Sequence, residues 1–374
     1  MPTYGSPYQK KLFIKRQKMN PVLRIFPIIF SCISLFANSA EYLKNRSFYY
    51  PYDLSELPIA DWKNPTMDDY ALINQTIRAN IHRMCQTSEE EREPFTAAKE
   101  LGWVTYRMRK IQFINIAHPE NPPECHTIYF NNDPNRKDKC IVCYLSFSPL
   151  DINWPRGIKL MIQALKVANY DGHFMYRIGG WPSLQKNRLK LADVPYAFKP
   201  FFLEEARDLG YEKILWIDAC IMPLTNLDLI FQWLEQQGFG YFSYGCQMPA
   251  VYMNPRKYVM SAMGFHPTRP YRDISSRVVG INTKHARGNT MLDAWLAAAE
   301  LKIPFCEPNG DQLSFATIVN EMHFLNCEFP ATWFQETSGK KISKPRNPRT
   351  QLSHQIGIVD ATLGEPDLND IFER

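Results

Sequence analysis

The chain has 374 residues, of which 45% are hydrophobic and 13% aromatic. That composition excludes an intrinsically disordered protein, because disordered chains lack the apolar side chains that build a core. The formal net charge is +5, but six basic residues precede Glu41, and +5 less these six leaves −1 for the remainder. A near-neutral body has no electrostatic footprint for nucleic acid, so nucleic-acid binding is excluded.

The first forty residues have the layout of an export signal. A basic stretch precedes an apolar run from Ile25 to Ala37, and small residues follow up to Ala40. The run is shorter than the ~20 residues that a membrane-spanning helix needs. We therefore predict a signal peptide over residues 1–40, with an uncleaved anchor through residues 21–40 as the alternative. Either reading predicts export or a secretory-pathway lumen, with a membrane tether if the anchor stays.

Residues 41–135 are predicted to form an N-terminal extension. They contain a predicted helix near 66–86 and a charged helical stretch near 88–101. A polar break over 131–138 (NNDPNRKD) then separates them from the main domain, because such turn-forming residues mark boundaries between elements. The main domain is predicted over residues 136–374.

Strands and helices alternate through the main domain. Short apolar runs rich in β-branched residues predict strands over 140–147, 173–178, 213–217, 239–244 and 278–281. Apolar residues at helical spacing predict helices over 156–168, 198–209, 289–301 and 311–322, and another that Thr225 caps and Gly238 ends. Strands separated by helices predict an α/β sandwich, with a mostly parallel central sheet and helices on both faces.

One carboxylate stands at the edge where such a sheet binds ligands. Asp218 directly follows the apolar strand KILWI, and ligands of open α/β sheets bind beyond the carboxyl ends of the strands. The competing interpretation is a turn residue that bonds its own backbone. The strand-edge position favours a functional role for Asp218.

The segment from Tyr196 to Cys220 resembles the region around the Asp-x-Asp motif of GT-A-fold glycosyltransferases. A helix opened by Lys199-Pro200 leads into an apolar strand that ends in an acid. Downstream, Val279-Gly-Ile-Asn282 and Gly310-Asp-Gln312 resemble the acceptor-side strand and the Asp-Gln helix start of the same family. The resemblance implies an enzyme that moves a sugar from a nucleotide-diphosphate donor to a hydroxyl of a glycan, lipid or protein.

The resemblance also assigns roles to individual positions. Catalysis falls to Asp218 and Asp311, and donor binding to Asp218, Lys199, Asp151 and Trp154. Acceptor binding falls to Asn282, Asp311 and Gln312. A purely structural role stays open for three of them: Lys199 as a solvated lysine, Asp311 as the N-cap of its helix, and Trp154 as a core residue.

A metal site is expected from the resemblance, but one ligand departs from the pattern. Mn²⁺ or Mg²⁺ would be held by Asp218, Cys220 and His354 and would neutralise the leaving diphosphate. Cys220 stands where the family has its second Asp, and a thiolate suits softer metals. A lone His is also more often a surface or core residue than a ligand. Metal-free neutralisation by a cation, with Lys199 as the candidate, is the alternative.

Two other functions compete with the transferase. A sugar-phosphate nucleotidyltransferase needs a glycine-rich phosphate loop after the first strand, and residues 146–151 contain no glycine. A non-catalytic protein of the same fold that binds a nucleotide or carbohydrate is the stronger alternative, and the cysteine at position 220 supports it.

Overall fold

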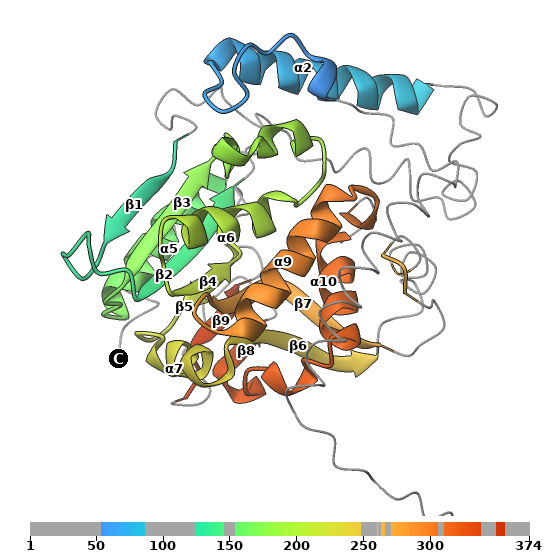
Figure 1. Ribbon diagram of the computed structural model, residues 1–374. Coiled ribbons are helices and arrows are strands. Elements are labelled where there is room, and N and C mark those ends of the chain that lie inside the picture. The colour runs from blue at the N-terminus through green and yellow to red at the C-terminus, as the bar shows by residue number, and fades with distance from the viewer. Residues whose placement is uncertain are drawn as a thin grey trace, which may run out of the picture.

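The computed structural model describes residues 54–86, 124–145, 154–247, 260, 263–265, 271–305, 310–337 and 349–355 (Figure 1). The predicted leader and the predicted helical stretch near 88–101 lie outside these residues. Within them, no helix combines the length and the apolar character needed to cross a bilayer.

A six-stranded sheet in the order β1-β3-β2-β4-β7-β6 forms the centre of the molecule. Its strands are β1 (His126–Tyr129), β2 (Lys139–Leu145), β3 (His173–Ile178), β4 (Lys213–Ile217), β6 (Phe239–Gln247) and β7 (Arg272–Asn282). Strands β3, β2 and β4 run parallel, whereas β1, β7 and β6 each pair antiparallel with their neighbours. The predicted α/β class is confirmed. The sheet is mixed rather than mostly parallel, because the later strands run back along the sheet.

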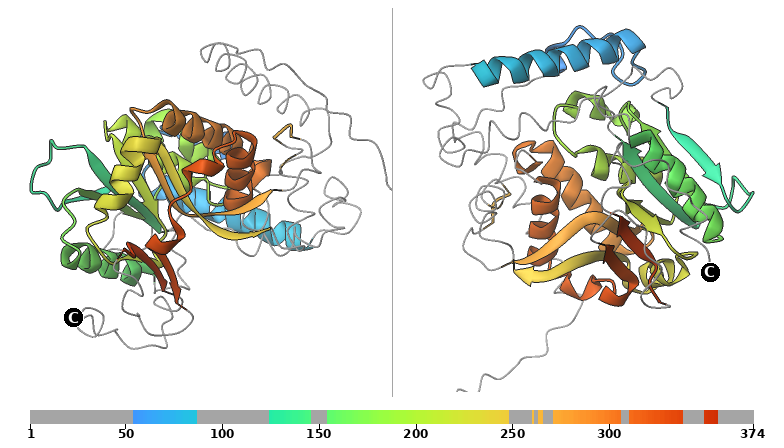
Figure 2. Two further views of the ribbon diagram at one scale, coloured as in Figure 1. Left: turned by 90° about the horizontal axis from the view of Figure 1, so that it is seen from below. Right: turned by 180° about the vertical axis from the view of Figure 1, so that it is seen from behind.

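Helices cover both faces of this sheet. One face carries α6 (Phe198–Asp208), α9 (Ala286–Glu300) and α10 (Gly310–Glu321), and the other carries α5 (Trp154–Val167) and α7 (Asp228–Gln237). Figure 2 shows α9 and α10 on one side of the strands and α5 on the opposite side. Strand β4 explains the division, because Ile214 and Trp216 enter one buried cluster while Leu215 and Ile217 enter the other.

A small second sheet brings the C-terminal part of the chain to the end of β4. It has the order β5-β9-β8, with β5 (Ile221–Pro223), β9 (Leu352–Gln355) and β8 (Phe334–Thr337). Ile221 pairs with His354 across the β5–β9 ladder. Short 3₁₀ helices complete the described fold at Leu54–Glu56, Leu184–Lys186, Arg188–Leu191, Ile303–Phe305, Leu325–Cys327 and Ala331–Trp333.

The N-terminal residues that are described belong to the same core as the main domain. Helix α2 (Met67–Gln86) buries Tyr70, Ile73 and Ile77 in the cluster that α6 and α9 also enter. Strand β1 is an edge strand of the main sheet. The boundary predicted between residues 135 and 136 therefore falls inside the α/β unit. It was misplaced because β1 is half-exposed and lacks an apolar run.

Most predicted elements lie where the periodicity placed them, with clear differences at α7 and at β7, which begins at Arg272 and not at residue 278. Strands β3 and β4 have the predicted bounds. Helix α7 begins at Asp228 and not after Thr225, since Leu227 has a left-handed backbone with φ 65°. Thr225 and Asn226 instead accept bonds from the backbone N–H groups of Leu227 and Asp228 in the preceding turn.

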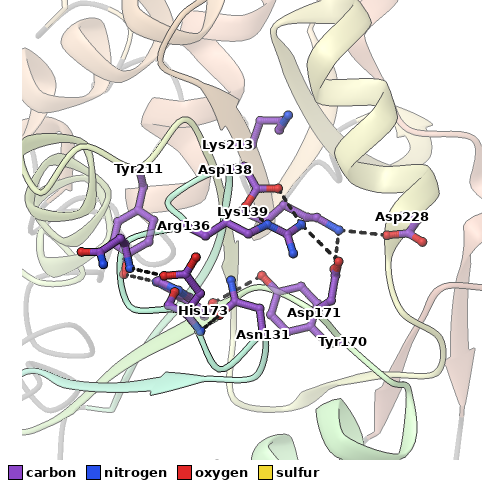
Figure 3. Close-up of polar contacts among 12 residues, drawn as sticks. Asn131, Arg136, Asp138, Lys139, Tyr170, Asp171, His173, Tyr211, Lys213 and Asp228 are labelled. Atoms are coloured by element: carbon purple, nitrogen blue, oxygen red, sulfur yellow. Dashed lines mark hydrogen bonds and ion pairs between the residues drawn. The ribbon is translucent and has the colours of Figure 1, made fainter.

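The amino ends of the parallel strands carry a dense polar network (Figure 3). Lys139 contacts Asp171 and lies 3.1 Å from Asp228, so that cations and carboxylates pair with one another. The ring of His173, which is fully buried, bonds the Tyr211 hydroxyl at 2.7 Å and the Asp133 carbonyl at 2.8 Å. These paired groups tie β2, β3 and α7 together, which is a structural role.

Candidate active site

Asp218 emerges at the carboxyl end of β4, as predicted. Its backbone N–H donates to the carbonyl of Arg277 on β7 at 2.9 Å, which fixes the turn that follows the strand. Residues two apart on a strand share a face, so Asp218 lies on the same side as Trp216. The Trp216 indole Nε1 donates to Asp218 Oδ1 at 2.7 Å. The carboxylate is therefore held toward the face covered by α6 and α10.

Lys199 joins Asp218 to a second carboxylate. Its Nζ lies 3.1 Å from Asp218 Oδ1 and 2.7 Å from Asp311 Oδ2. The lysine is only 5% exposed, because the aromatic side chains of α6 anchor this helix in the core. Its ammonium also lies 5.6 Å from the centre of the Trp216 ring, within the range of a cation–π contact. Lys199 is thus enclosed by two acids and an indole.

Asp311 lies in the first turn of α10 and faces into this cluster. The Ser276 hydroxyl donates to Asp311 Oδ2 at 2.7 Å, beside the ion pair with Lys199. Helix α10 begins at Gly310, so Asp311 is inside the helix and is not its N-cap. A Cβ on Gly310 would lie 2.3 Å from the Phe305 carbonyl oxygen. The glycine therefore lets the helix start close enough to place Asp311 against Lys199.

The electrostatics of the cluster follow from burial and pairing. Burial opposes the charge on Lys199, but the carboxylates of Asp218 and Asp311 outweigh it and hold the lysine pKa above its ordinary value. Burial raises the pKa of Asp218, and the Lys199 ammonium and the Trp216 N–H offset only part of that rise. One cation against two carboxylates leaves the ionised cluster with one negative charge.

The metal ligands expected at this edge are Asp218, Cys220 and His354. Cys220 is half-buried two positions after Asp218, and burial raises its thiol pKa to about 12, so the sulfur stays neutral at physiological pH. The backbone of His354 lies opposite Ile221, but its side chain is outside the described part of the molecule. Among the described side chains, no group of three or more His, Cys, Asp or Glu could hold a metal ion. These donors do not fit the oxygen-rich site that Mg²⁺ or Mn²⁺ prefers.

Of the other predicted site residues, the structure places one near the cluster and one far from it. Gln312 lies near the cluster, where its Nε2 donates to Asp273 Oδ1 at 3.0 Å. Asn282 lies far from the cluster, because it pairs with Lys213 at the start of β4, about 16 Å along the strand from Asp218. Its placement as an acceptor residue was an error of strand direction, since β7 runs antiparallel to β4. Asp151 and the side chain of Trp154 lie outside the described residues.

Three residues of this edge were missed by sequence reasoning. Trp216 bonds Asp218, Ser276 bonds Asp311, and Arg277 pairs with Asp218 through its backbone. The positive charge of Arg277 also reaches Cys220 and Asp273, where it lowers the pKa of both against the larger effect of burial. The polar pair Ser275-Ser276 followed by Arg277, just before an apolar strand end, was the signal in the sequence.

Comparison with known proteins gives matches among solved structures alone. No protein-family model and no curated protein matches the chain. Mouse xyloside xylosyltransferase 1 matches with 10% identity and a TM-score of 0.39, over 59% of this chain and 98% of that one. The galactosyltransferase LgtC, in complex with donor and acceptor sugar analogues, matches with 14% identity and a TM-score of 0.33, over 58% and 87%. The glycosyltransferase GlyE of Streptococcus pneumoniae matches with 12% identity and a TM-score of 0.31, over 53% and 46%.

These structural matches are to glycosyltransferases of the GT-A fold, at low sequence identity. They concern the arrangement of strands and helices.

Proposed function

We propose that this protein transfers a sugar from a nucleotide-diphosphate donor to a hydroxyl of an acceptor. The observation that carries the proposal is the meeting of Lys199, Asp218 and Asp311 in one cluster, in which Lys199 and Asp311 are buried and Asp218 is partly exposed. The three residues come from α6, the end of β4 and α10. Their cluster lies at the sheet edge where α/β proteins bind ligands.

Asp311 supplies a carboxylate suited to the acceptor side of the reaction. Its Oδ2 lies 2.7 Å from the Lys199 ammonium and accepts from the Ser276 hydroxyl. A carboxylate so placed can orient an acceptor hydroxyl, or take its proton as the sugar–phosphate bond breaks and the diphosphate leaves. Asp218, held by Trp216, is the donor-side carboxylate of the same cluster.

Lys199 is assigned to positioning and not to direct phosphate contact. Its ammonium already lies between two carboxylates, and only 5% of the residue is exposed. A cation neutralised in this way holds both acids at fixed positions. Fixed geometry of this kind lowers the cost of bringing donor and acceptor together.

The proposal is tested by turnover of a panel of nucleotide sugars. Wild-type protein should release nucleoside diphosphate from at least one donor, and Asp218→Ala should reduce the rate by about a hundredfold or more. Asp228→Ala is the matched control, because Asp228 also pairs with a lysine but lies at the opposite edge of the sheet. Equal rates for wild type and Asp218→Ala would remove Asp218 from the mechanism.

A non-catalytic nucleotide- or carbohydrate-binding protein is the second candidate. The neutral thiol of Cys220 favours a binding protein, because this cysteine stands where the Asp-x-Asp motif that the segment resembles has its second acid. Calorimetry with nucleoside diphosphates and simple sugars, together with the turnover assay, separates the two candidates. Binding without turnover of any donor would support the binding protein, and turnover would exclude it.

A further inference from the structure

Tyr196 has a backbone conformation that a tyrosine rarely adopts. Its φ is 61°, in the left-handed region, where a bulky side chain crowds the following carbonyl. The residue is third in a turn that begins at Val194, whose carbonyl accepts the backbone N–H of Ala197 at 3.3 Å. Glycine or asparagine is usual at a position of positive φ in such a turn. The tyrosine therefore costs free energy here, which the surrounding structure must offset.

Leu227 shows how burial can offset the same conformation. Its φ is 65°, and its side chain is fully buried in the core cluster under α5 and α7. Tyr196 is only partly buried, against the core cluster on the α6 face. Core packing therefore accounts for less of the strain at Tyr196 than at Leu227. Strained residues of this kind concentrate at active sites and ligand contacts.

The ring of Tyr196 lies beside the cluster of Lys199, Asp218 and Asp311. The Lys199 ammonium is 5.9 Å from the centre of the Tyr196 ring, within the range of a cation–π contact. The same ammonium contacts Asp218 on the donor side and Asp311 on the acceptor side. Because one nitrogen touches both carboxylates, a ring this close to it lies near the point between them. In the proposed reaction that point holds the transferred sugar.

Tyr196 is also the partly exposed member of a group of three rings around Lys199. The rings of Phe198 and Trp216 are buried, with their centres 6.0 Å apart. Phe198 supports the Tyr196 ring from the core, at 6.1 Å between centres. Asp218 is partly exposed as well, with 24% of its side chain accessible. A ligand that reaches the cluster from solvent therefore meets Tyr196 and Asp218.

From this arrangement we propose that the ring of Tyr196 packs against the transferred sugar of the donor and holds its reacting carbon between Asp218 and Asp311. A sugar ring presents C–H bonds on one face, and the negative face of an aromatic ring attracts such weakly positive hydrogens. The inference rests on the proposed function, because it names the residue that contacts the sugar which that function transfers. Tyr196 is a positioning residue in this account and takes part in no covalent step.

The test measures release of nucleoside diphosphate from a panel of uridine and guanosine diphosphate sugars by the full-length protein, with water as the acceptor. Hydrolysis is slow, so KM reports the affinity for the donor, and free nucleoside diphosphate is added as an inhibitor. Tyr196→Leu should raise KM by about threefold to tenfold, the loss expected for one aromatic contact. The inhibition constant should stay within about twofold of wild type, because free diphosphate carries no sugar. Tyr196→Phe, which keeps the ring, should resemble wild type in both constants.

A glycine variant separates the ring from the strained backbone. Glycine adopts a φ of 61° without strain, so Tyr196→Gly keeps the turn and should show a rise in KM like that of Tyr196→Leu. Tyr129→Leu is the matched control, because Tyr129 is 42% exposed and pairs with the first residue of β3, at the opposite edge of the sheet. That variant should leave both constants unchanged. Thermal unfolding shows whether each variant is folded.

The possible results are distinguishable. An unchanged KM in folded Tyr196→Leu and Tyr196→Gly proteins, or a rise in KM matched by an equal rise in the inhibition constant, would overturn this inference and leave the proposed function standing. A rise in Tyr196→Leu that Tyr196→Gly does not share would assign the effect to the backbone and would also overturn it. Failure of wild type to release nucleoside diphosphate from any donor would overturn both.

Discussion

The Lys199 ammonium lies 2.7 Å from Asp311 Oδ2, and the two side chains are each 6% exposed. This buried pair links α6 to the first turn of α10 on the face of the sheet that Asp218 also faces. Removing one partner of a buried pair leaves an uncompensated charge, which costs far more than loss of an exposed pair. The pair therefore connects the stability of the domain to the geometry of its candidate site.

Removal of the buried cation should destabilise the fold measurably. Lys199→Met leaves Asp218 and Asp311 facing one another without a counter-charge, and we expect a loss of about 3 kcal/mol in unfolding free energy. Asp208→Asn, which removes only the half-exposed partner of Lys186, should cost under about 1 kcal/mol. Urea unfolding measures both. If Asp311→Asn added to Lys199→Met gave no recovery, the two residues would not be coupled.

The indole N–H of Trp216 should matter for turnover more than for stability. Trp216→Phe keeps a buried aromatic ring but removes the donor that holds Asp218 Oδ1 at 2.7 Å. We expect turnover of the donor to fall about tenfold, in the range for a lost positioning contact. Trp233→Phe is the control, because that indole N–H donates to the Cys327 carbonyl on the other face. Similar rates for the two variants would show that Trp216 only fills space.

The start of α10 should tolerate no side chain at position 310. In Gly310→Ala the new Cβ would lie 2.3 Å from the Phe305 carbonyl oxygen, so the helix start must move and carry Asp311 with it. We expect a loss of about 1–3 kcal/mol together with loss of turnover.

A second glycine provides the control for this substitution. In Gly288→Ala the Cβ would lie 2.3 Å from the Asn282 carbonyl oxygen, a comparable overlap at the opposite end of the sheet. That variant should lose similar stability yet keep the activity per folded molecule. Thermal unfolding and donor turnover are measured on both. Full activity in Gly310→Ala would contradict the role given to the helix start.

Glu204 should make the stability depend on pH in the acid range. Burial opposes its charge, but bonds from Arg188 and Lys186 prevail and hold its pKa below the ordinary value of 4.5. A depressed pKa means that the stabilisation is present above pH 4.5 and is lost as the pH falls through the folded-state pKa. Glu204→Gln should therefore be less stable than wild type at pH 7, by about 3 kcal/mol.

The difference between wild type and Glu204→Gln should then shrink as the pH falls below about 4.5. Urea midpoints measured from neutral to acid pH follow it. Glu235→Gln, which removes an exposed partner of Lys213, should differ from wild type by under about 1 kcal/mol at every pH. A difference for Glu204→Gln that stayed constant would mean that its pairing with Arg188 contributes nothing.

The sequence predicted local elements well where one period dominated. Strand β4 and the helix that carries Lys199 were identified from apolar runs and helical spacing, and Asp218 from its place after the strand. Strands β1 and β9 were missed because each is short and lacks a buried apolar run. Asn282 was misplaced because an apolar run carries no information on strand direction, which pairing with β4 decides.

Partnerships between distant residues could not be read from the sequence. Lys199 was predicted to meet phosphate, but the fold places two carboxylates within 3.1 Å of its ammonium. Charge and spacing alone do not reveal that α6 and α10 lie on the same face. Ser276 and Arg277 form a polar run in the sequence, but their place beside Asp218 depends on β7 running past the end of β4.

The central claim is that Lys199, Asp218 and Asp311 form the transfer site of a nucleotide-sugar-dependent enzyme. Its most direct measurement is donor turnover by Asp311→Asn, a substitution that nearly keeps the side-chain shape but removes the negative charge and replaces one acceptor oxygen with an N–H donor. We predict that turnover falls by about a hundredfold or more while nucleoside diphosphate binding stays within about twofold of wild type. Turnover at the wild-type rate in a folded Asp311→Asn protein would contradict the account.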